Sequence, residues 1–276
     1  MSLITLLPAD AVPQAVQDER SLLVDARSAQ AYWAGHLPGA RHLDPALLAL
    51  SRTDAASLGA FDTLLTALLS QLGARADSRI LVYGQKLDTE AARIAWALAY
   101  AGHADIAVVD GGLDALATQQ PALQLSTEAP AVRATPYQPA FRRALLATAE
   151  QIRSGLPEGA QQLLDAREAA DYRGEKSSAA RFGHIPGARH WDVGVELAEG
   201  GRLAAPAALH ARLEAAGVSA DQPVVLYCGG GGRAARSFLA LSAAGHEQVA
   251  VYPASWREWG NRDDLPLETA APAVPA

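Results

Sequence analysis

The chain has 276 residues, half of them apolar, with a net charge of −7 at pH 7. This acidic balance argues against general nucleic-acid binding, which needs a basic surface. A single cysteine cannot form an internal disulfide, and no apolar run reaches the roughly 18 residues of a membrane-spanning helix. The N-terminus, MSLITLLPADAVPQ, has no basic residue before its short apolar run and is not predicted to be a signal peptide. We therefore expect a soluble protein in a reducing compartment, the cytoplasm.

The first predicted strand is the apolar run LLVDA from Leu22, which precedes the turn HLPGA. A second run, ILVYG from Ile80, leads into an alanine-rich helical pattern, and a third, IAVVD, begins at Ile106. Short unbroken apolar runs that alternate with helical patterns indicate a parallel sheet with helices on both faces.

A proline-containing stretch follows this first set of elements and is typical of an extended connector. We place an N-terminal domain at 1–124, a linker at 125–142 and a C-terminal domain at 143–276. The second domain has the same order of elements, with the apolar runs LLDA, PVVLY and QVAVY and the turn HIPGA. The final stretch APAVPA is expected to be frayed.

The two halves are copies of each other. Asp25 corresponds to Asp165 with an offset of 140, and His36 corresponds to His184 with an offset of 148. The second copy therefore carries eight extra residues between these two points. A repeat of this length is a domain duplication. The predicted fold class is α/β, a tandem duplication in which each domain is a parallel sheet with helices on both faces.

The only cysteine, Cys228, follows the predicted strand PVVLY and precedes Gly229–Gly232, Arg233 and a helical pattern that closes near Gly245. Ligands of open α/β sheets bind at the carboxyl ends of strands. Free N–H groups at a helix start, left-handed glycines and an arginine together form an anion cradle. Such a field favours the thiolate, which is the nucleophilic form of cysteine. We expect Cys228 to be catalytic and the loop to bind an anion.

The first copy lacks this arrangement. Gly84 takes the place of Cys228, and Tyr83 matches Tyr227. The loop that follows, GQKLDTE, has neither a thiol nor a run of glycines. We therefore expect the N-terminal domain to be catalytically inactive. Asp25, Asp165 and their neighbouring arginines occur in both copies and are interpreted as structural, as are the two histidines, which we expect to hydrogen-bond the PGA turns.

Three features carry a family resemblance: the pair DARSAQAYWAGHLPGA and DAREAADYRGEKSSAARFGHIPGA, the lone cysteine between strand and helix, and ASWREWGNRDDLPLE. With them the chain resembles the two-domain sulfurtransferases of the rhodanese family, most closely the bacterial thiosulfate:cyanide sulfurtransferases. The resemblance implies transfer of sulfane sulfur from thiosulfate to cyanide or a thiol acceptor, such as a thioredoxin-like protein, through a persulfide on Cys228. No residue cluster has metal-ligand spacing, so neither a metal nor another cofactor is expected, and we expect a monomer that binds no nucleic acid and no membrane.

Two departures from the family leave the sulfur donor open. Gly229 and Gly230 stand where vertebrate-like thiosulfate enzymes carry basic residues, and a glycine directly after the cysteine is more similar to 3-mercaptopyruvate sulfurtransferases. Asp171 stands where many members carry a substrate-binding arginine. The inserted segment RGEKSSAARF offers Arg173 and Lys176 as donor-binding replacements, with Arg181 as a further candidate, although a solvated surface loop would have the same composition. Near the end of the chain, the resemblance brings Ser255 close to the loop, whereas Trp256 and Trp259 either wall the pocket or fill an interface.

Other functions compete with this one. A phosphatase or arsenate reductase would also use a Cys–loop–Arg cradle, but Cys228 and Arg233 enclose four residues, whereas the tyrosine-phosphatase pattern encloses five. A non-catalytic sulfur carrier would keep the loop without turnover. A purely structural duplicated domain would leave unexplained why Cys228 breaks the internal symmetry.

Overall fold

The computed structural model describes residues 3–269, and all six predicted apolar runs form strands in it. The tail APAVPA, which we expected to be frayed, lies outside the described residues. The chain divides into two compact units, which we call unit 1 (Met1–Leu48, Gly59–Arg143 and Leu197–Ala204) and unit 2 (Ala49–Leu58, Ala144–Glu196 and Ala205–Ala276). Each unit thus includes one short segment from the copy that forms the bulk of the other.

Unit 1 is built on a five-stranded parallel sheet with strand order β1-β5-β4-β2-β3. Three of its strands are the predicted apolar runs, whose side chains are largely buried. The other two are very short. The strands are β1 (Thr5–Leu7), β2 (Ser21–Asp25), β3 (Arg41–His42), β4 (Arg79–Tyr83) and β5 (Asp105–Val109).

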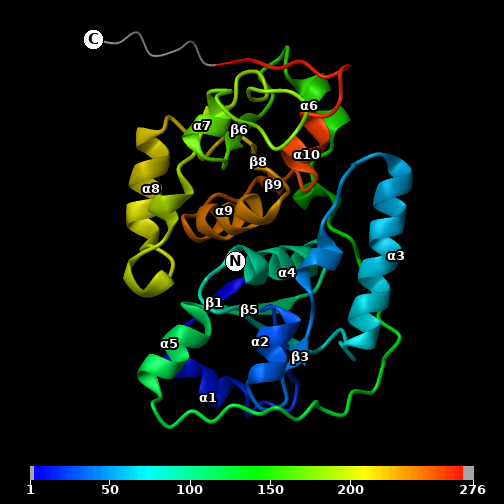
Figure 1. The fold of residues 1–276 in the computed structure, drawn as a ribbon, viewed down its shortest axis with the longest axis vertical. Helices are drawn as coiled ribbons and strands as arrows, with labels where there is room; N and C mark the ends of the chain where they lie inside the picture. Colours follow the sequence, from blue (N-terminus) through cyan, green and yellow to red (C-terminus); the bar gives the residue numbers. More distant parts are fainter. Residues whose placement is uncertain (1–2, 270–276) are drawn as a thin grey trace. The chain divides into compact units, whose positions relative to one another are not determined.

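Helices flank this sheet, and the alanine-rich pattern predicted after the second strand forms α4 (Thr89–Tyr100) (Figure 1). Small alanine side chains let α4 lie close to β4 and β5, and nine of its residues are buried. The remaining α-helices are α1 (Val12–Ala15), α2 (Ala29–Ala34), α3 (Ala55–Gln71, whose residues 59–71 belong to unit 1) and α5 (Gly112–Gln119).

The proline-containing connector 125–142 contains no helix or strand, as predicted for an extended segment. It runs along unit 1 and is held there by backbone hydrogen bonds. Ser126 exchanges two of them with His36, and the N–H of Thr135 donates to the carbonyl of Ser70 at 3.0 Å. Tyr137 is the buried side chain of this stretch.

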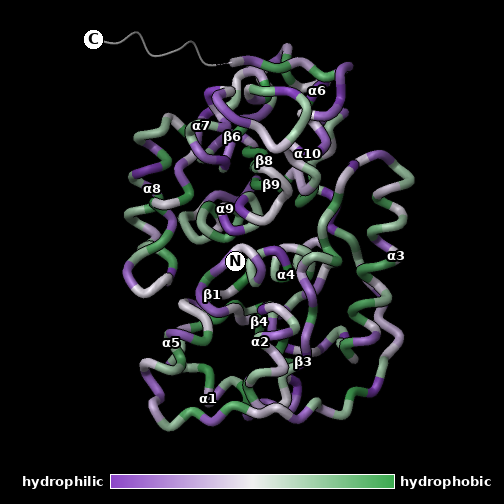
Figure 2. Tube along the Cα trace, in the orientation of Figure 1, coloured by the Kyte–Doolittle hydropathy of each residue, from purple (hydrophilic) through white to green (hydrophobic). Residues whose placement is uncertain are grey.

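Unit 2 repeats the design with a four-stranded parallel sheet of order β7-β6-β8-β9. Asp165 lies opposite Tyr227 on neighbouring strands, as Asp25 lies opposite Tyr83 in unit 1, which confirms the duplication. β6 and β8 are the two central strands of this sheet, and the hydrophobic colouring of β8 in Figure 2 agrees with its complete burial. The strands are β6 (Gln162–Asp165), β7 (Arg189–His190), β8 (Val224–Tyr227) and β9 (Val249–Val251).

The helix predicted after the cysteine loop is α9 (Gly232–Ala243), which begins one residue before Arg233. Its end agrees with the sequence, because Gly245 has a left-handed φ of +93° shortly after the last helical residue. The other α-helices of unit 2 are α6 (Ala149–Gly155), α7 (Ala169–Tyr172), α8 (Pro206–Ala215) and α10 (Ser255–Trp259). Within residues 3–269, no helix is both long and apolar enough to cross a membrane.

Candidate active site

Cys228 lies directly after β8, at the carboxyl end of a completely buried strand, and its side chain is only 2% exposed. The backbone N–H of Gly231 donates a hydrogen bond to the Cys228 Sγ at 3.1 Å. Gly231 must be glycine, since its φ is +88° and a Cβ there would lie 2.5 Å from the carbonyl oxygen of Pro253. The loop therefore turns back on the sulfur and places a backbone donor against it.

Helix α10 holds this loop from the other side. The N–H of Trp256 donates to the Cys228 carbonyl at 2.9 Å, and the N–H of Arg257 donates to the Gly229 carbonyl at 3.0 Å. The Ser255 hydroxyl accepts a hydrogen bond from the Cys228 N–H at 3.0 Å. Ser255 is the one non-glycine residue of the described chain with a left-handed φ, +55°. The resemblance therefore brought Ser255 to the correct place, and the structure adds a strained backbone there.

Arg233 is half-buried on the first turn of α9, with Nη2 3.8 Å from where a Cβ on Gly229 would lie. Within residues 3–269 its side chain makes no hydrogen bond and no ion pair. Hydrogen bonding to Lys176 lowers the pKa of Glu168, and the positive charge of Arg233 adds to the effect. The Glu168 carboxylate is thus paired with Lys176 and not with Arg233, so the positive charge of Arg233 stays available beside the cysteine loop.

Arg173 and Lys176 are both exposed and both paired with acids of their own segment. The Arg173 guanidinium binds Glu175 at 2.6 Å. The Lys176 ammonium binds Glu168 and lies 3.7 Å from Asp171. Neither side chain hydrogen-bonds the Cys228 loop in the described part of the chain. Arg181, the third cation of the insertion, donates to the carbonyl oxygens of Leu265 and Trp259 and thus ties the insertion to the end of unit 2.

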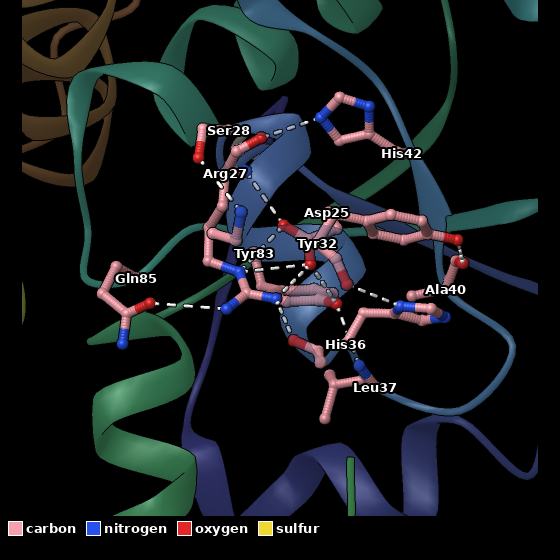
Figure 3. Close-up of polar contacts among 12 residues, drawn as sticks. Asp25, Arg27, Ser28, Tyr32, His36, Leu37, Ala40, His42, Tyr83 and Gln85 are labelled. Carbon is pink, nitrogen blue, oxygen red and sulfur yellow. Dashed lines mark hydrogen bonds and ion pairs between the residues drawn. The ribbon is translucent and has the colours of Figure 1, made fainter. Parts of the chain in front are cut away.

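The duplicated aspartates and arginines form buried ion pairs. Arg27 donates to Asp25 through Nε and Nη2, and the Tyr83 hydroxyl donates to the same carboxylate at 2.7 Å (Figure 3). Arg167 binds Asp165 in the same way in unit 2. Such pairs, present in both copies, fix the carboxyl ends of the strands, in line with their interpretation as structural.

The prediction that the two histidine side chains hydrogen-bond the PGA turns is wrong. The His36 Nδ1 lies 2.9 Å from the Tyr32 carbonyl, and the His184 Nδ1 lies 2.8 Å from the Tyr172 carbonyl. They instead bind carbonyls in the last turns of α2 and α7, where fewer backbone donors remain, although the Tyr32 carbonyl also accepts from the Gly35 N–H at 3.1 Å. Figure 3 shows the His36 ring beside Tyr32, with which it stacks at 3.8 Å between ring centroids.

Trp256 and Trp259 are fully buried within unit 2. The Trp256 Nε1 donates to the Ser177 hydroxyl at 3.1 Å, and the Arg167 guanidinium lies 4.3 Å above the Trp256 ring. The Trp259 Nε1 donates to the Pro266 carbonyl at 2.7 Å. The two indoles therefore belong to the core that supports the loop. Among residues 3–269, no group of three or more His, Cys, Asp or Glu side chains is arranged to hold a metal ion.

The sequence profile of the rhodanese-like domain matches residues 8–119 and 148–262. The chain belongs to the rhodanese family. A thiosulfate sulfurtransferase of Pseudomonas aeruginosa is 33% identical over 96% of this chain and 97% of its own length. A thiosulfate sulfurtransferase of Azotobacter vinelandii is 34% identical over 90% of both chains. A 3-mercaptopyruvate sulfurtransferase of Escherichia coli is 29% identical over 97% of this chain and 99% of its own.

Solved structures agree on the rhodanese fold. YnjE superposes with a TM-score of 0.84 at 24% identity, over 97% of this chain and 69% of that chain. The anaerobic ergothioneine biosynthesis enzyme from Chlorobium limicola superposes with a TM-score of 0.84 at 21% identity, over 97% of this chain and 70% of that one. At these identities the likeness shows the fold alone.

In the first rhodanese-like copy, the loop after β4 is occupied by a side chain of the chain itself. A Cβ on Gly84 would lie 2.2 Å from an Asp88 carboxylate oxygen, so no larger residue fits there without a shift. The Asp88 carboxylate caps α4, accepting hydrogen bonds from the N–H groups of Ala91 and Gln85, both at 2.9 Å. An anion belonging to the chain itself thus occupies the N–H groups that an external anion would need. Burial raises the pKa of Asp88.

Sequence reasoning missed two residues of this region. Asp88 was overlooked, although an aspartate immediately before a helical pattern is an N-cap signal. Arg257 was overlooked because its segment was interpreted through its tryptophans and serine. Its guanidinium nevertheless lies beside Gly230, with Nη2 3.0 Å from where a Cβ on that glycine would stand.

Proposed function

We propose that this rhodanese-family chain is a thiosulfate sulfurtransferase that carries the transferred sulfur as a persulfide on Cys228. The observation that supports this best is the Gly231 N–H, 3.1 Å from the only thiol sulfur, in a loop at the carboxyl end of a buried strand. Relatives named thiosulfate sulfurtransferase support the same choice of donor.

The chemistry proceeds in two displacements. The Cys228 thiolate attacks the outer sulfur of thiosulfate, the donor's S–S bond breaks, and its electron pair leaves on sulfite. The Cys228 persulfide then waits until cyanide or a thiolate attacks its outer sulfur, which releases the Cys228 thiolate and gives thiocyanate or an acceptor persulfide. Covalent catalysis of this kind divides one transfer into two easier steps.

The loop and its cations have separate tasks in this proposal. The backbone of Gly229–Gly232 cradles the persulfide sulfur, whose negative charge is stabilised by N–H donors that are already oriented. Arg233 binds the anionic donor and favours the thiolate of Cys228. Arg173 and Lys176 are the outer donor-binding residues, with their charges shared with neighbouring carboxylates.

We assign catalysis to a C-terminal domain at 143–276 and an inactive, supporting role to the domain at 1–124, with 125–142 as the linker. The inactivity follows from Gly84 and from the Asp88 carboxylate, which leave no thiol and no free cradle. The acceptor is cyanide or a thiol, such as that of a thioredoxin-like protein. A monomer in the cytoplasm fits this chemistry, because a reducing compartment keeps a lone thiol available.

3-Mercaptopyruvate is the alternative donor, favoured by the glycine after Cys228 and by the relative of that name. A comparison of kcat/KM for thiosulfate and 3-mercaptopyruvate, with cyanide as the acceptor, decides between the two donors.

Intact-mass measurement after incubation with thiosulfate tests the mechanism itself. We expect a gain of one sulfur atom that is absent from Cys228→Ser and that cyanide removes. Full sulfurtransferase activity in Cys228→Ser would contradict the proposal, as would a wild-type protein that neither gains the sulfur atom nor turns over either donor.

A further inference from the structure

We propose that Arg257 binds the oxyanion end of the sulfur donor and is a specificity-determining residue of the Cys228 site. The inference rests on the proposed function. Thiosulfate and 3-mercaptopyruvate share the relevant chemistry, since each joins a transferable sulfur to a small oxyanion that a guanidinium can bind.

The position of Arg257 is set by the loop itself. Its N–H donates to the Gly229 carbonyl at 3.0 Å, which ties its backbone to the residue after Cys228. Its guanidinium occupies the space beside Gly230, where a side chain on that residue would meet Nη2 at 3.0 Å. Arg233 stands in the same relation to Gly229, at 3.8 Å. Two consecutive glycines after the cysteine are thus each accompanied by an arginine from a helix.

These two guanidiniums are also free to bind a ligand. In the described part of the chain, the side chains of Arg233 and Arg257 make no hydrogen bond and no ion pair. Arg173 and Lys176, in contrast, are engaged by carboxylates. Unpaired charge beside a nucleophile attracts an anionic substrate more strongly than charge already neutralised by a neighbour. Arg233 and Arg257 therefore provide, from two helices, the positive charge that the glycines at positions 229 and 230 lack.

The helix that carries Arg257 is firmly anchored. The buried Glu258 carboxylate accepts hydrogen bonds from the Thr53 hydroxyl at 2.7 Å and the Tyr252 hydroxyl at 2.9 Å, all within unit 2. Trp256, on the other side of Arg257 in sequence, is fully buried. Arg257 itself is exposed, so a fixed backbone presents its guanidinium to solvent beside the loop. This arrangement suits a residue that meets an incoming anion.

Steady-state kinetics provide the first test. We expect Arg257→Gln to raise the KM for thiosulfate or for 3-mercaptopyruvate about tenfold, with a much smaller change in kcat. The reason is that the lost charge-assisted contact would be made equally in the ground state and the transition state. Arg153→Gln, which removes an exposed arginine of α6, is the matched control and should leave KM unchanged. The donor whose KM rises more, thiosulfate or 3-mercaptopyruvate, is the one that Arg257 recognises. An unchanged KM for both donors would overturn the inference.

Moving the positive charge from position 257 to position 230 provides the second test. Gly230 has no left-handed φ, so a lysine fits its backbone once the Arg257 side chain is shortened. We expect Gly230→Lys combined with Arg257→Gln to bring KM back to within about threefold of wild type, because the charge returns to the same place. A double variant no better than Arg257→Gln alone would contradict a role of charge at this position.

Alkylation of Cys228 tests the inference without any sulfur transfer. Iodoacetate is anionic and iodoacetamide is neutral, and both alkylate the thiolate of Cys228 by displacement of iodide, adding groups of similar size. Arg257→Gln should slow alkylation by iodoacetate several-fold more than alkylation by iodoacetamide, and added salt should reduce the difference. Equal slowing by both reagents would indicate a displaced loop and overturn the inference, whether or not the proposed function holds.

Discussion

The Ser255 hydroxyl joins the backbone of Cys228 to the backbone of Tyr252: it accepts from the N–H of Cys228 at 3.0 Å and donates to the carbonyl of Tyr252 at 2.8 Å. Both contacts are buried, and Ser255 keeps a left-handed φ of +55° to make them. Strain of this kind persists only where the surrounding structure enforces it. The position of Cys228 is thus determined as much by α10 as by the loop in which the cysteine lies.

Replacing Ser255 should therefore weaken both the fold and the chemistry. Ser255→Ala leaves the buried N–H of Cys228 without its acceptor and retains the strained φ, so we expect unfolding free energy to fall by about 1–3 kcal/mol. The rate of persulfide formation should fall with it. Urea unfolding and timed intact-mass measurement report the two effects. Ser178→Ala, at an exposed serine, should stay within about 0.5 kcal/mol of wild type.

The glycines of the loop should differ sharply in their tolerance of a methyl group. Gly231→Ala combines a φ of +88° with a Cβ 2.5 Å from the Pro253 carbonyl oxygen, and we expect it to lose at least about 2 kcal/mol of stability and most sulfur loading. Gly229→Ala meets only the flexible end of Arg233, at 3.8 Å, and should stay within about 1 kcal/mol of wild type. Thermal unfolding compares the two. Equal losses would show that the loop needs flexibility rather than the particular turn at Gly231.

By pairing with Glu168, Lys176 should keep that carboxylate from forming an ion pair with Arg233. Hydrogen bonding to Lys176 lowers the pKa of Glu168, and Arg233 contributes through its charge, so Glu168 experiences both cations. We expect Lys176→Ala to release Glu168 toward Arg233 and raise the KM for thiosulfate more than it lowers kcat. Adding Glu168→Gln to Lys176→Ala should reverse most of that rise. A KM that stays as high as in Lys176→Ala alone would show instead that Lys176 acts on the donor directly and not through Glu168.

Stability in the acid range should depend on His103 of unit 1. Its Nε2 donates to the Ser78 carbonyl at 2.8 Å and its Nδ1 accepts from the Tyr137 hydroxyl at 2.9 Å, while burial lowers the pKa of His103. Below the unfolded pKa of about 6.5 the unfolded chain binds a proton at His103 more readily than the folded chain does. The contribution of neutral His103 to the free energy of unfolding is therefore complete above that pKa and is lost as the pH falls through the lower folded pKa.

Urea unfolding at about pH 7.5 and about pH 5.5 measures this dependence. Wild type should lose more unfolding free energy between the two conditions than His103→Gln does. His210→Gln, at an exposed histidine of α8, should follow wild type. Identical pH dependence in His103→Gln and wild type would exclude the buried histidine as its source.

The sequence allowed prediction of the strands that are long enough to be recognised and of the loop that carries the thiol. The six apolar runs form strands because each is buried between helices. Unbroken apolar runs that alternate with helical patterns indicate such burial in the sequence. β3 and β7 were missed because a run of two residues has no periodicity, and β1 was missed because its apolar run was considered only as a possible signal peptide; pairing with neighbouring strands holds all three in place. Cys228 stood out because it has no equivalent in the other copy.

The surroundings of the thiol could not be predicted in the same way. Arg257 comes beside Gly230 only when α10 folds against the loop, a contact between segments far apart in the sequence. The ion pairs of Arg173 and Lys176 depend on side-chain choices that a charge pattern leaves open. The membership of 49–58 in unit 2 and of 197–204 in unit 1 is likewise a result of tertiary packing.

That exchange of segments also bears on how the protein can evolve. Unit 2 contains Thr53, a residue of the first copy, whose hydroxyl accepts from the Ala149 N–H at 3.0 Å and donates to Glu258 at 2.7 Å. A gene shortened to its second half would encode the thiol but not this residue, leaving the Ala149 N–H unsatisfied and the buried Glu258 carboxylate with one donor fewer. The second copy alone therefore lacks part of unit 2, and a cut at the boundary of the repeat would not release an intact thiol-bearing unit.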